Sequence, residues 1–558
     1  MSVAKGLNAQ QRLRIKKFFD ENDPNVFVKS FISKRFGKDS ENGEIINSPK
    51  IVEKPKEKHA KNQVIIPSVA INIKKGCAFD DLANLSSDST ACISLEIMSK
   101  LYQINIGAPN QTFVVEEEII SPLSEDISVL FSEAKPLRMC ISLISPDPSF
   151  VGMSVFDWRR ALTNEIIDTN INMLGLQGEI VGILSVEIKL VGFNSPFDIS
   201  KISRTLELQI RQETLDSIEQ ERINASEIKS LWKEIAQLLG EDAPQLLSQE
   251  MTRPQTSLFS YISPFTIRSL PTPGHCLRFC SILSPIITQN CWTVVPNWVA
   301  VYSKCGSYRT KCNLLVSLLR GFGMNAYVAI SQPYPIVVAI SDIPTFFDIT
   351  MGKFSNKIPQ RISNISLLYN EASLFINMNP HDSASVIDWN INNPIKWKIY
   401  KPQNMQKQSP PVLSEMYQTH TNSKLIVSQV KKLIEAHRKS IGLSTKWNSD
   451  LEPILQPILM SYESERISGQ TTGVHSIASE SIRRAIKPYH SLKAAPAFSI
   501  SSSPSSVFNA ISNTTSGMDI ISSNDNESSF TLSIKQYIYP GNTICNWVLL
   551  ALDSVSTI

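Results

Sequence analysis

Residues 183–191 read ILSVEIKLV, and their alternation decides the fold of the first part of the chain. Leu184, Val186 and Ile188 alternate with polar residues, which is the period of a strand with one buried face. Similar segments lie upstream and are separated by turn-forming residues. They are VAINIK, ISLEIM, YQINI, TFVVEEEI and MCISLI. The pattern predicts an antiparallel β-sandwich over residues 66–195.

The segment before this sandwich is basic and contains few large apolar residues over much of its length. Residues 1–75 hold 16 Lys and Arg against 8 Asp and Glu, whereas the whole chain has a net charge of only +3. Such a composition cannot bury enough apolar surface to offset the entropy of ordering. We therefore expect residues 1–65 to form a basic tail, with a short helix followed by a disordered linker.

A charged helical pattern follows the sandwich, over residues 196–250. Leu208, Leu215 and Ile218 recur at helical spacing, and Gly240 is a suitable helix stop. The pattern continues with Trp232, Ile235 and Leu239. We expect a helical connector.

Residues 251–400 mix helical and strand patterns. A helix is predicted over Thr310–Arg320, ended by Gly321 and Gly323, and strands follow at AYVAI, PIVVAI and TFFDI. This order of elements is typical of an α+β domain. A polar link with prolines is expected over residues 401–420.

The last region, residues 421–558, is predicted to be a mixed α/β domain. In KLIVSQVKKLIEAHRKSIG, apolar residues follow one helical face, namely Ile426, Val430, Leu433 and Ile441. The strands TLSIKQYIYP and CNWVLLAL close the chain. Between these parts, residues 501–529 are rich in Ser and Asn, so we expect a disordered insertion there.

Length and composition set the class of protein. The chain has 558 residues, 42% hydrophobic and 19% charged, which indicates several soluble domains rather than one core. No apolar run approaches the roughly 20 residues of a membrane span, and no signal-peptide pattern is found at the N-terminus. Nine widely spaced cysteines favour reduced thiols. A cytoplasmic protein is expected.

The chain resembles the 76-kDa centrosomal protein family in a collinear series of peptides. They are SVAINIKKGCAF at 68–79, DWRRAL at 157–162, VGILSVEIKL at 181–190, LWKEIAQLL at 231–239, RSLPTPGHCLRFCSIL at 268–283, EAHRKSIGLSTKW at 435–447, SYESER at 461–466, IRRAIKPYHSLK at 482–493 and YPGNTICNWV at 539–548. The coiled-coil and C2 proteins of the ciliary transition zone are the second family to consider.

The resemblance implies a C2-type sandwich, a transglutaminase-like or papain-like domain, and a family-specific C-terminal domain. It also implies a non-catalytic scaffold of the centrosome, centriole or ciliary basal body, with a role in centriole duplication or cilium assembly. Expected partners are centriolar or ciliary proteins, with tubulin and microtubule-associated proteins as candidates. Neither nucleic acid, nor a small-molecule substrate, nor a cofactor is expected. A membrane-surface adaptor acting through the C2 domain is the alternative, ahead of a cysteine transglutaminase or protease.

Three catalytic positions of the family can be identified by matching peptides. The nucleophile position falls on Tyr308 in KCGSYRTKCNLL, the histidine position on Tyr334 in SQPYPIVVAI, and the acidic position on Asp348 in TFFDIT. A phenol with a pKa of about 10 does not replace a thiolate at neutral pH. The resemblance therefore implies a pseudoenzyme.

A shifted nucleophile is the remaining route to catalysis. Cys305 and Cys312 lie near the predicted helix start, but no histidine occurs between His275 and His381 to serve as their base. Both cysteines are therefore expected to be structural.

Metal sites are also not expected. His275, Cys276 and Cys280 fall short of the four ligands of a structural zinc site. Calcium needs about 6–8 converging oxygens, and the acidic residues of the sandwich are too scattered to supply them. These residues are Glu116, Glu117, Glu118, Asp147 and Asp157.

Overall fold

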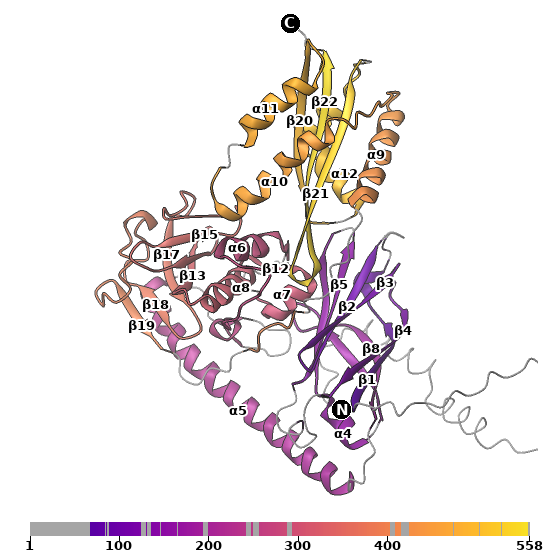
Figure 1. Ribbon diagram of the computed structural model, residues 1–558. Helices are drawn as coiled ribbons and strands as arrows, with labels where there is room; N and C mark the ends of the chain where they lie inside the picture. Colours follow the sequence, from indigo (N-terminus) through magenta and orange to yellow (C-terminus); the bar gives the residue numbers. More distant parts are fainter. Residues whose placement is uncertain are drawn as a thin grey trace, which may run out of the picture.

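The computed structural model describes residues 67–83, 85, 89–123, 130, 135–145, 147–164, 166–192, 199–240, 247–248, 256–286, 293–401, 408–413, 423–471, 474–501, 503–525 and 527–555 (Figure 1). The expected basic tail at residues 1–65 lies outside these ranges, as does much of the expected link at 401–420. The described part is an α+β protein.

The first domain is an antiparallel β-sandwich of eight strands (Figure 1). Its strands are β1 Ser68–Cys77, β2 Thr90–Ile97, β3 Lys100–Gly107, β4 Phe113–Pro122, β5 Leu137–Ser145, β6 Ser149–Phe156, β7 Ile166–Leu174 and β8 Ile180–Val191. They form two four-stranded sheets, β3-β2-β5-β6 and β7-β8-β1-β4, joined where Met153 of β6 pairs with Leu174 of β7. Short helical segments occur at η2 Asp80–Leu82, η3 Trp158–Arg160 and α4 Ala161–Asn164.

The strand register predicted from alternation is confirmed. Leu184, Val186 and Ile188 have no exposed side-chain surface, and the polar residues between them are only partly buried. On the neighbouring strand β1, Val69 and Ile71 are buried in the same way. A one-residue slip would turn these residues outward, so the buried face fixes the register.

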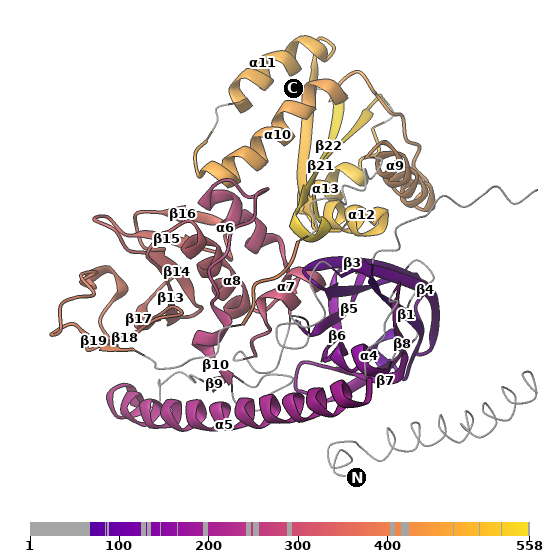
Figure 2. The same cartoon turned by 60° about the horizontal axis from the view of Figure 1, so that its bottom comes forward.

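A single helix of 41 residues, α5 Ile199–Leu239, follows the sandwich. Figure 2 shows it running along the outside of the molecule, from the sandwich to the second domain. It ends just before Gly240, whose φ of +62° is favoured by glycine.

The apolar residues that predicted this helix are mostly exposed, although one of them, Ile235, is buried. Leu208, Leu215 and Ile218 are exposed, at 60%, 53% and 57%. The residues of the helix that are buried are Leu206, Ile228, Leu231 and Ile235. Periodicity identified the helix but not its packing, because α5 contacts its neighbours through a different face.

The second domain contains a seven-stranded antiparallel sheet in the order β16-β15-β14-β13-β17-β18-β19. Its strands are β13 Ala326–Gln332, β14 Ile336–Ala339, β15 Thr345–Asp348, β16 Lys353–Ser355, β17 Asn364–Tyr369, β18 Leu374–Asn377 and β19 Trp397–Tyr400. Its helices are η5 Leu258–Tyr261, α6 Pro273–Ile282, α7 Asn297–Ser303, α8 Tyr308–Gly321 and η6 Ala384–Val386. Short strand pairs occur at β9 Leu247–Ser248 with β10 Thr256–Ser257, and at β11 Ser284–Pro285 with β12 Cys305–Gly306.

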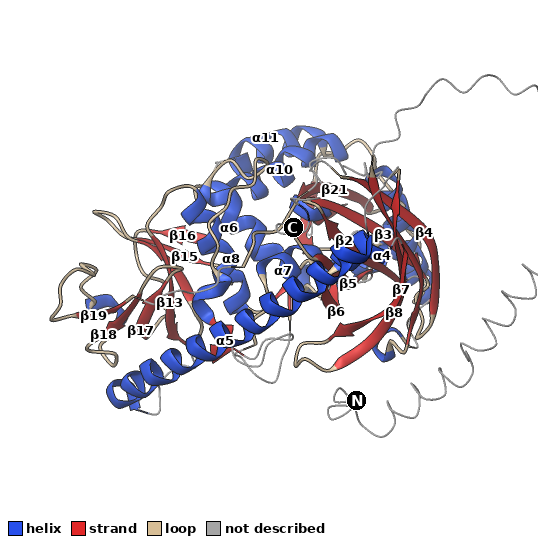
Figure 3. Ribbon diagram, turned by 90° about the horizontal axis from the view of Figure 1, so that it is seen from below, coloured by secondary structure: helices blue, strands red, loops and turns tan. Residues whose placement is uncertain are grey.

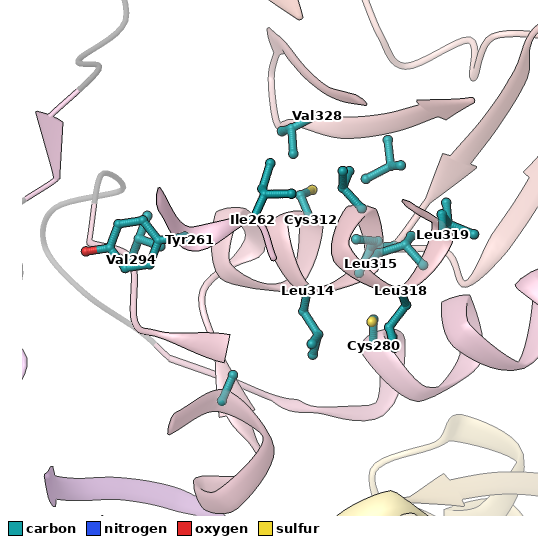
Figure 4. Close-up of a cluster of buried hydrophobic side chains, with 14 of the residues drawn as sticks. Tyr261, Ile262, Cys280, Val294, Cys312, Leu314, Leu315, Leu318, Leu319 and Val328 are labelled. Atoms are coloured by element: carbon teal, nitrogen blue, oxygen red, sulfur yellow. The ribbon is translucent and has the colours of Figure 1, made fainter. Parts of the chain in front are cut away.

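Helix α8 is the centre of this domain's core. Figure 4 shows Cys312 and Leu315 on the side of Val328 from the sheet, and Leu314 and Leu318 toward α6. All of these side chains have no exposed surface. The cysteine of this helix is therefore part of its packing, as predicted.

The C-terminal domain has the three-stranded sheet β20-β22-β21, with helices on both faces. Its elements are α9 Ser423–Ser440, α10 Glu452–Ser468, α11 Val474–Ala485, β20 His490–Ser499, α12 Pro504–Ser512, α13 Thr515–Ile521, β21 Ser529–Tyr539, η7 Pro540–Asn542 and β22 Thr543–Val555. Val548 and Leu550 of β22 pack with α9, α12 and α13, whereas Leu549 and Ala551 pack with α10. Figure 3 shows α10 and α11 above the second domain.

Two predictions for this domain are wrong. The insertion expected to be disordered at 501–529 contains α12 and α13, which bury Val507, Ile511, Ile520 and Ile521. The apolar face of α9 is wrong in its second half: Ile426 and Val430 are buried as predicted, but Ile434 rather than Leu433, which is 36% exposed, continues the buried face. Ile441, 49% exposed, lies beyond the helix end at Ser440. Ser503 stands at the N-cap of α12, and Thr514 caps α13 by accepting a hydrogen bond from the backbone N–H of Gly517 at 3.0 Å, so polar residues of this run bound helices rather than prevent folding.

No helix among the described ranges is long and apolar enough to cross a membrane.

Candidate functional site

The N-terminus of α8 presents the first of the three catalytic positions. Ser307 caps the helix by accepting a hydrogen bond at its side-chain oxygen from the backbone N–H of Thr310, at 3.2 Å. Tyr308 is the first residue of the helix and is 52% exposed. The position where a helix dipole would favour a thiolate is thus occupied by an accessible phenol.

The second and third positions are joined by a hydrogen bond. Tyr334 lies in the turn between β13 and β14, and Asp348 ends β15, which pairs with β14. The hydroxyl of Tyr334 donates to Oδ2 of Asp348 at 3.1 Å. The other carboxylate oxygen, Oδ1, accepts from the backbone N–H and hydroxyl of Thr350, at 2.9 and 2.6 Å, and from the N–H of Met351 at 3.1 Å.

All three positions therefore meet in space. The rings of Tyr308 and Tyr334 are 6.3 Å apart between centroids and inclined at 30°. The acid that would orient an imidazole in an active enzyme instead holds a tyrosine. Burial, together with the charge of Asp348, raises the pKa of Tyr334, so its phenol is not a base at neutral pH.

Two cysteines lie near this helix start. Cys305 and Cys312 are buried, at 1% and 0% exposure. Burial raises the pKa of each thiol to about 12, so the thiolate fraction at pH 7 is negligible. Their Sγ atoms lie 3.1 Å from the carbonyl of Ser303 and 3.6 Å from that of Pro335.

The two histidines nearest in sequence are engaged elsewhere or exposed. His275 lies in the first turn of α6, where Nδ1 is 2.7 Å from the hydroxyl of Thr272. His381 is exposed in the segment between β18 and β19. Among the hydrogen bonds of the described residues, none joins either histidine to Tyr308 or Asp348.

The candidate metal ligands do not gather. Within the described ranges there is no group of three His, Cys, Asp or Glu residues able to hold an ion. In the sandwich, Glu118 pairs with Lys189 at 2.6 Å, and Asp157 accepts from the backbone N–H of Arg159. Cys276 and Cys280 are buried in α6, as expected for core residues.

A buried charge cluster joins the second domain to the C-terminal domain. Glu463 of α10 accepts two hydrogen bonds from Arg278 of α6, from Nε and Nη2, each at 2.9 Å. It also accepts from Nε1 of Trp547 at 2.6 Å and from the hydroxyl of Tyr539. The side chains of Glu463 and Arg278 are only 2% and 7% exposed.

The balance of forces on this carboxylate favours its charged form. Burial acts to raise the pKa of Glu463, but hydrogen bonding and attraction from Arg278 outweigh it. Hydrogen bonds from Tyr539 and Trp547 add to the effect, so the pKa lies below its ordinary value of 4.5. We call these four residues the Glu463 cluster.

A second buried cluster joins the sandwich to the second domain. Glu96 of β2 accepts from the hydroxyl of Tyr302 in α7 at 2.5 Å and pairs with Arg138 of β5 at 3.2 Å. The same hydroxyl accepts from the backbone N–H of Val412 at 3.0 Å. Every residue of α7 is buried, so this helix is enclosed between its neighbours.

The long helix and the last hairpin add further connections. Glu213 of α5 pairs with Arg159 of the sandwich at 2.6 Å, and Glu234 of α5 pairs with Lys398 of β19 at 3.0 Å. At the tip of the β21–β22 hairpin, Asn542 donates to Gln103 of β3 at 3.3 Å. Three domains are thus fastened to one another by polar contacts, two of them buried clusters.

Sequence reasoning found the catalytic positions but missed both clusters. Arg278 and Glu463 are 185 residues apart, and Tyr302 and Glu96 are 206 apart. No local pattern identifies such pairs. The available signals are that Arg278 and Glu463 lie in peptides that carry the family resemblance and that Glu96 lies in a predicted strand.

Comparison with known proteins gives two family models that match the chain. The "CEP76 peptidase-like domain" matches residues 290–399, and the "Centrosomal protein of 76 kDa C-terminal domain" matches residues 415–555. The Centrosomal protein of 76 kDa of Xenopus tropicalis is 24% identical over 478 residues, covering 76% of this chain and 71% of that protein. The Homo sapiens protein is 22% identical, covering 76% and 72%. The predicted resemblance is confirmed.

Solved structures similar to the chain include C2 domains. A structure of two C2 domains of Extended-Synaptotagmin 2 matches at a TM-score of 0.19 and 14% identity, over 26% of this chain and 48% of that one. A C2 domain-containing protein from a putative elicitor-responsive gene matches at a TM-score of 0.19 and 14% identity, over 25% and 99%. Such scores carry no argument, and the sandwich rests on its own strand pairing.

Proposed function

The chain is a relative of the 76-kDa centrosomal proteins, and on that premise we propose that it is a non-catalytic scaffold of the centrosome or ciliary base. Every relative reported above is named as a centrosomal protein, which supports this location. In this proposal the C2-type sandwich and the transglutaminase-like domain bind protein partners. The role extends to control of centriole duplication or cilium assembly.

One observation carries the non-catalytic part of the proposal. The three predicted catalytic positions lie together, with Tyr334 bonded to Asp348 and its ring 6.3 Å from that of Tyr308. Two of the three chemical groups are nevertheless replaced by phenols. A fold that keeps this geometry without its thiol and imidazole is suited to binding rather than turnover.

The two buried clusters support the scaffold part. A buried carboxylate with several donors holds its partners in one geometry, because a shift would leave charges without partners in a low dielectric. The Glu463 cluster and the Glu96–Tyr302–Arg138 cluster therefore fix the relative positions of three domains. Surfaces on different domains would then face their partners at constant spacing.

The proposal is tested by tagging the endogenous protein and imaging it with a centriole marker and with tubulin. We expect a focus that coincides with the centriole marker through the cell cycle. Replacing Glu463 by Ala should weaken that focus, while replacing the exposed Glu480 by Ala should leave it unchanged. A diffuse or vesicular signal for the wild-type protein would contradict the proposed function.

A further inference from the structure

Large apolar side chains are exposed along one stripe of α5. They are Leu208, Leu215, Ile218 and Trp232, at 60%, 53%, 57% and 41% exposure. Leu208 and Leu215 are seven residues apart, and Ile218 and Trp232 are fourteen apart, with Ile218 three residues after Leu215. This spacing is the a and d pattern of a helix that pairs with another helix.

The other positions of the same stripe are mostly cationic. The positions of the stripe follow one another at alternating spacings of four and three residues. They are 204, 208, 211, 215, 218, 222, 225, 229 and 232, and their residues are R, L, R, L, I, R, A, K and W in that order. Arg204, Arg211, Arg222 and Lys229 are all exposed, and Arg222 also pairs with Glu219 of the same helix at 3.0 Å. No Asp or Glu occupies any of these nine positions. We call these residues the α5 stripe.

The first half of the stripe lies away from the face that α5 buries, whereas Trp232 follows the buried Ile228 by one turn and lies at the edge of that face, 41% exposed. At 100° per residue, Leu208 and Leu215 are separated by about 140–180° from Leu206 and Ile228, which are buried. The helix is also held at two points by ion pairs to other elements, through Glu213 and Glu234. The stripe is therefore presented on a helix already fixed in place.

We propose that the α5 stripe docks an acidic amphipathic helix of a partner protein. Apolar residues of that helix would pack against Leu208, Leu215, Ile218 and Trp232, and its Glu and Asp residues would pair with the cations of the stripe. From residue 208 to residue 232 the stripe extends about 36 Å, at 1.5 Å per residue. A partner helix of roughly 25 residues would cover it.

The charge of the α5 stripe distinguishes an acidic partner helix from other possible binding partners. Residues 1–75 carry twice as many Lys and Arg as Asp and Glu, so the chain's own N-terminal segment would place cations against cations. A second copy of α5 would do the same. An anionic membrane would attract the cations, but here they lie within the apolar stripe rather than beside it. That arrangement leaves no wide apolar face to insert.

The inference adds a partner site to the scaffold but stands on α5 alone, so its failure would leave the proposed function untouched. The test uses the full chain and two designed helical peptides of 28 residues. Both peptides have Leu at every a and d position; one has Glu at every e and g position, and the other has Lys there. Binding is measured by fluorescence anisotropy at two salt concentrations.

We expect the acidic peptide to bind about eightfold more tightly than the basic one, since Arg204, Arg211 and Lys229 would each contribute about twofold through an exposed charge pair. Added salt should reduce this ratio. The double variant Leu215→Asp with Ile218→Asp should abolish binding of the acidic peptide. The matched control is Ile223→Asp, because Ile223 is also exposed on α5, at 43%, but lies off the stripe. This control should bind like the wild type.

Three results would overturn the proposal. The first is equal affinity for both peptides, or none for the acidic one. The second is a dimer of the full chain in light scattering that the Leu215→Asp, Ile218→Asp variant dissolves, which would make a second copy the occupant. The third is flotation with phosphatidylserine-containing vesicles that this variant abolishes while Ile223→Asp does not, which would assign the stripe to a membrane surface.

Discussion

Replacing Glu463 by Ala should destabilise the protein strongly. The change leaves the guanidinium of Arg278 buried, at 7% side-chain exposure, with its carboxylate partner removed. It also removes the acceptor for the hydroxyl of Tyr539 and for Nε1 of Trp547. Removing one partner of a buried ion pair costs about 3–5 kcal/mol. For a domain of this size the cost corresponds to a fall in Tm of roughly 10 °C.

The matched control is Glu480→Ala in α11 of the same domain. Glu480 pairs with Arg484, but both side chains are largely exposed, at 67% and 78%. An exposed pair contributes about 0–1 kcal/mol, so this variant should melt within about 2 °C of the wild type. Both are measured on the full chain by circular dichroism and by urea unfolding. Similar losses in the two variants would show that the Glu463 cluster does not hold the domains together.

Three other predictions concern the Glu463 carboxylate, the strand register of the sandwich and calcium binding. Because the pKa of Glu463 is lowered from 4.5, its charged form stabilises the fold above pH 4.5, and this stability should be lost as the pH falls through the lowered value; Glu463→Gln should show a flatter pH profile in acid unfolding. Val186→Asp should cost at least about 3 kcal/mol by burying a charge without a partner, whereas Ser185→Asp on the opposite face should be mild, and equal melting of the two would refute the register. Calcium up to millimolar concentrations should not move the Tm, and a rise reversed by a chelator would show a calcium site in the sandwich.

The sandwich was predictable from sequence because each strand has one buried face. Alternation in ILSVEIKLV indicates which side chains face the core. Packing cannot change this, because a shift of one residue would expose every buried side chain of the strand. Helices were less predictable. For α5, apolar spacing indicated a face containing Leu215 and Ile218, yet that face is exposed. A surface helix that contacts its neighbours along only part of its length has no single face that must be buried. Periodicity alone therefore cannot identify its packing face.

The C-terminal domain shows a second limit of pattern reading. A long Ser and Asn run was interpreted as disorder, although Val507 and Ile511 are four residues apart and fully buried in α12. On α9, Arg438 is 2% exposed and donates to the carbonyls of Ser523 and Ser444, at 2.8 and 2.7 Å. An arginine at a buried position is satisfied by carbonyls distant in sequence, and a hydrophobicity pattern cannot indicate this.

For the candidate site, resemblance located Tyr308, Tyr334 and Asp348 as separate positions. Only the structure gives the hydrogen bond between Tyr334 and Asp348 and the ring contact with Tyr308. It also shows that the thiols of Cys305 and Cys312 are buried, which raises the pKa of each to about 12 and disfavours the thiolate at neutral pH.

Turnover by the purified full chain tests the central claim most directly, in amine-incorporation and peptide-cleavage assays at neutral pH. The wild type, Tyr308→Cys and Tyr334→His should each show no turnover above buffer, because each lacks at least one of the thiolate and imidazole that such catalysis requires. Treatment with iodoacetamide should change nothing. Turnover by the wild type that is lost in Cys305→Ser or Cys312→Ser would contradict the account, since it would require a working cysteine nucleophile in this domain.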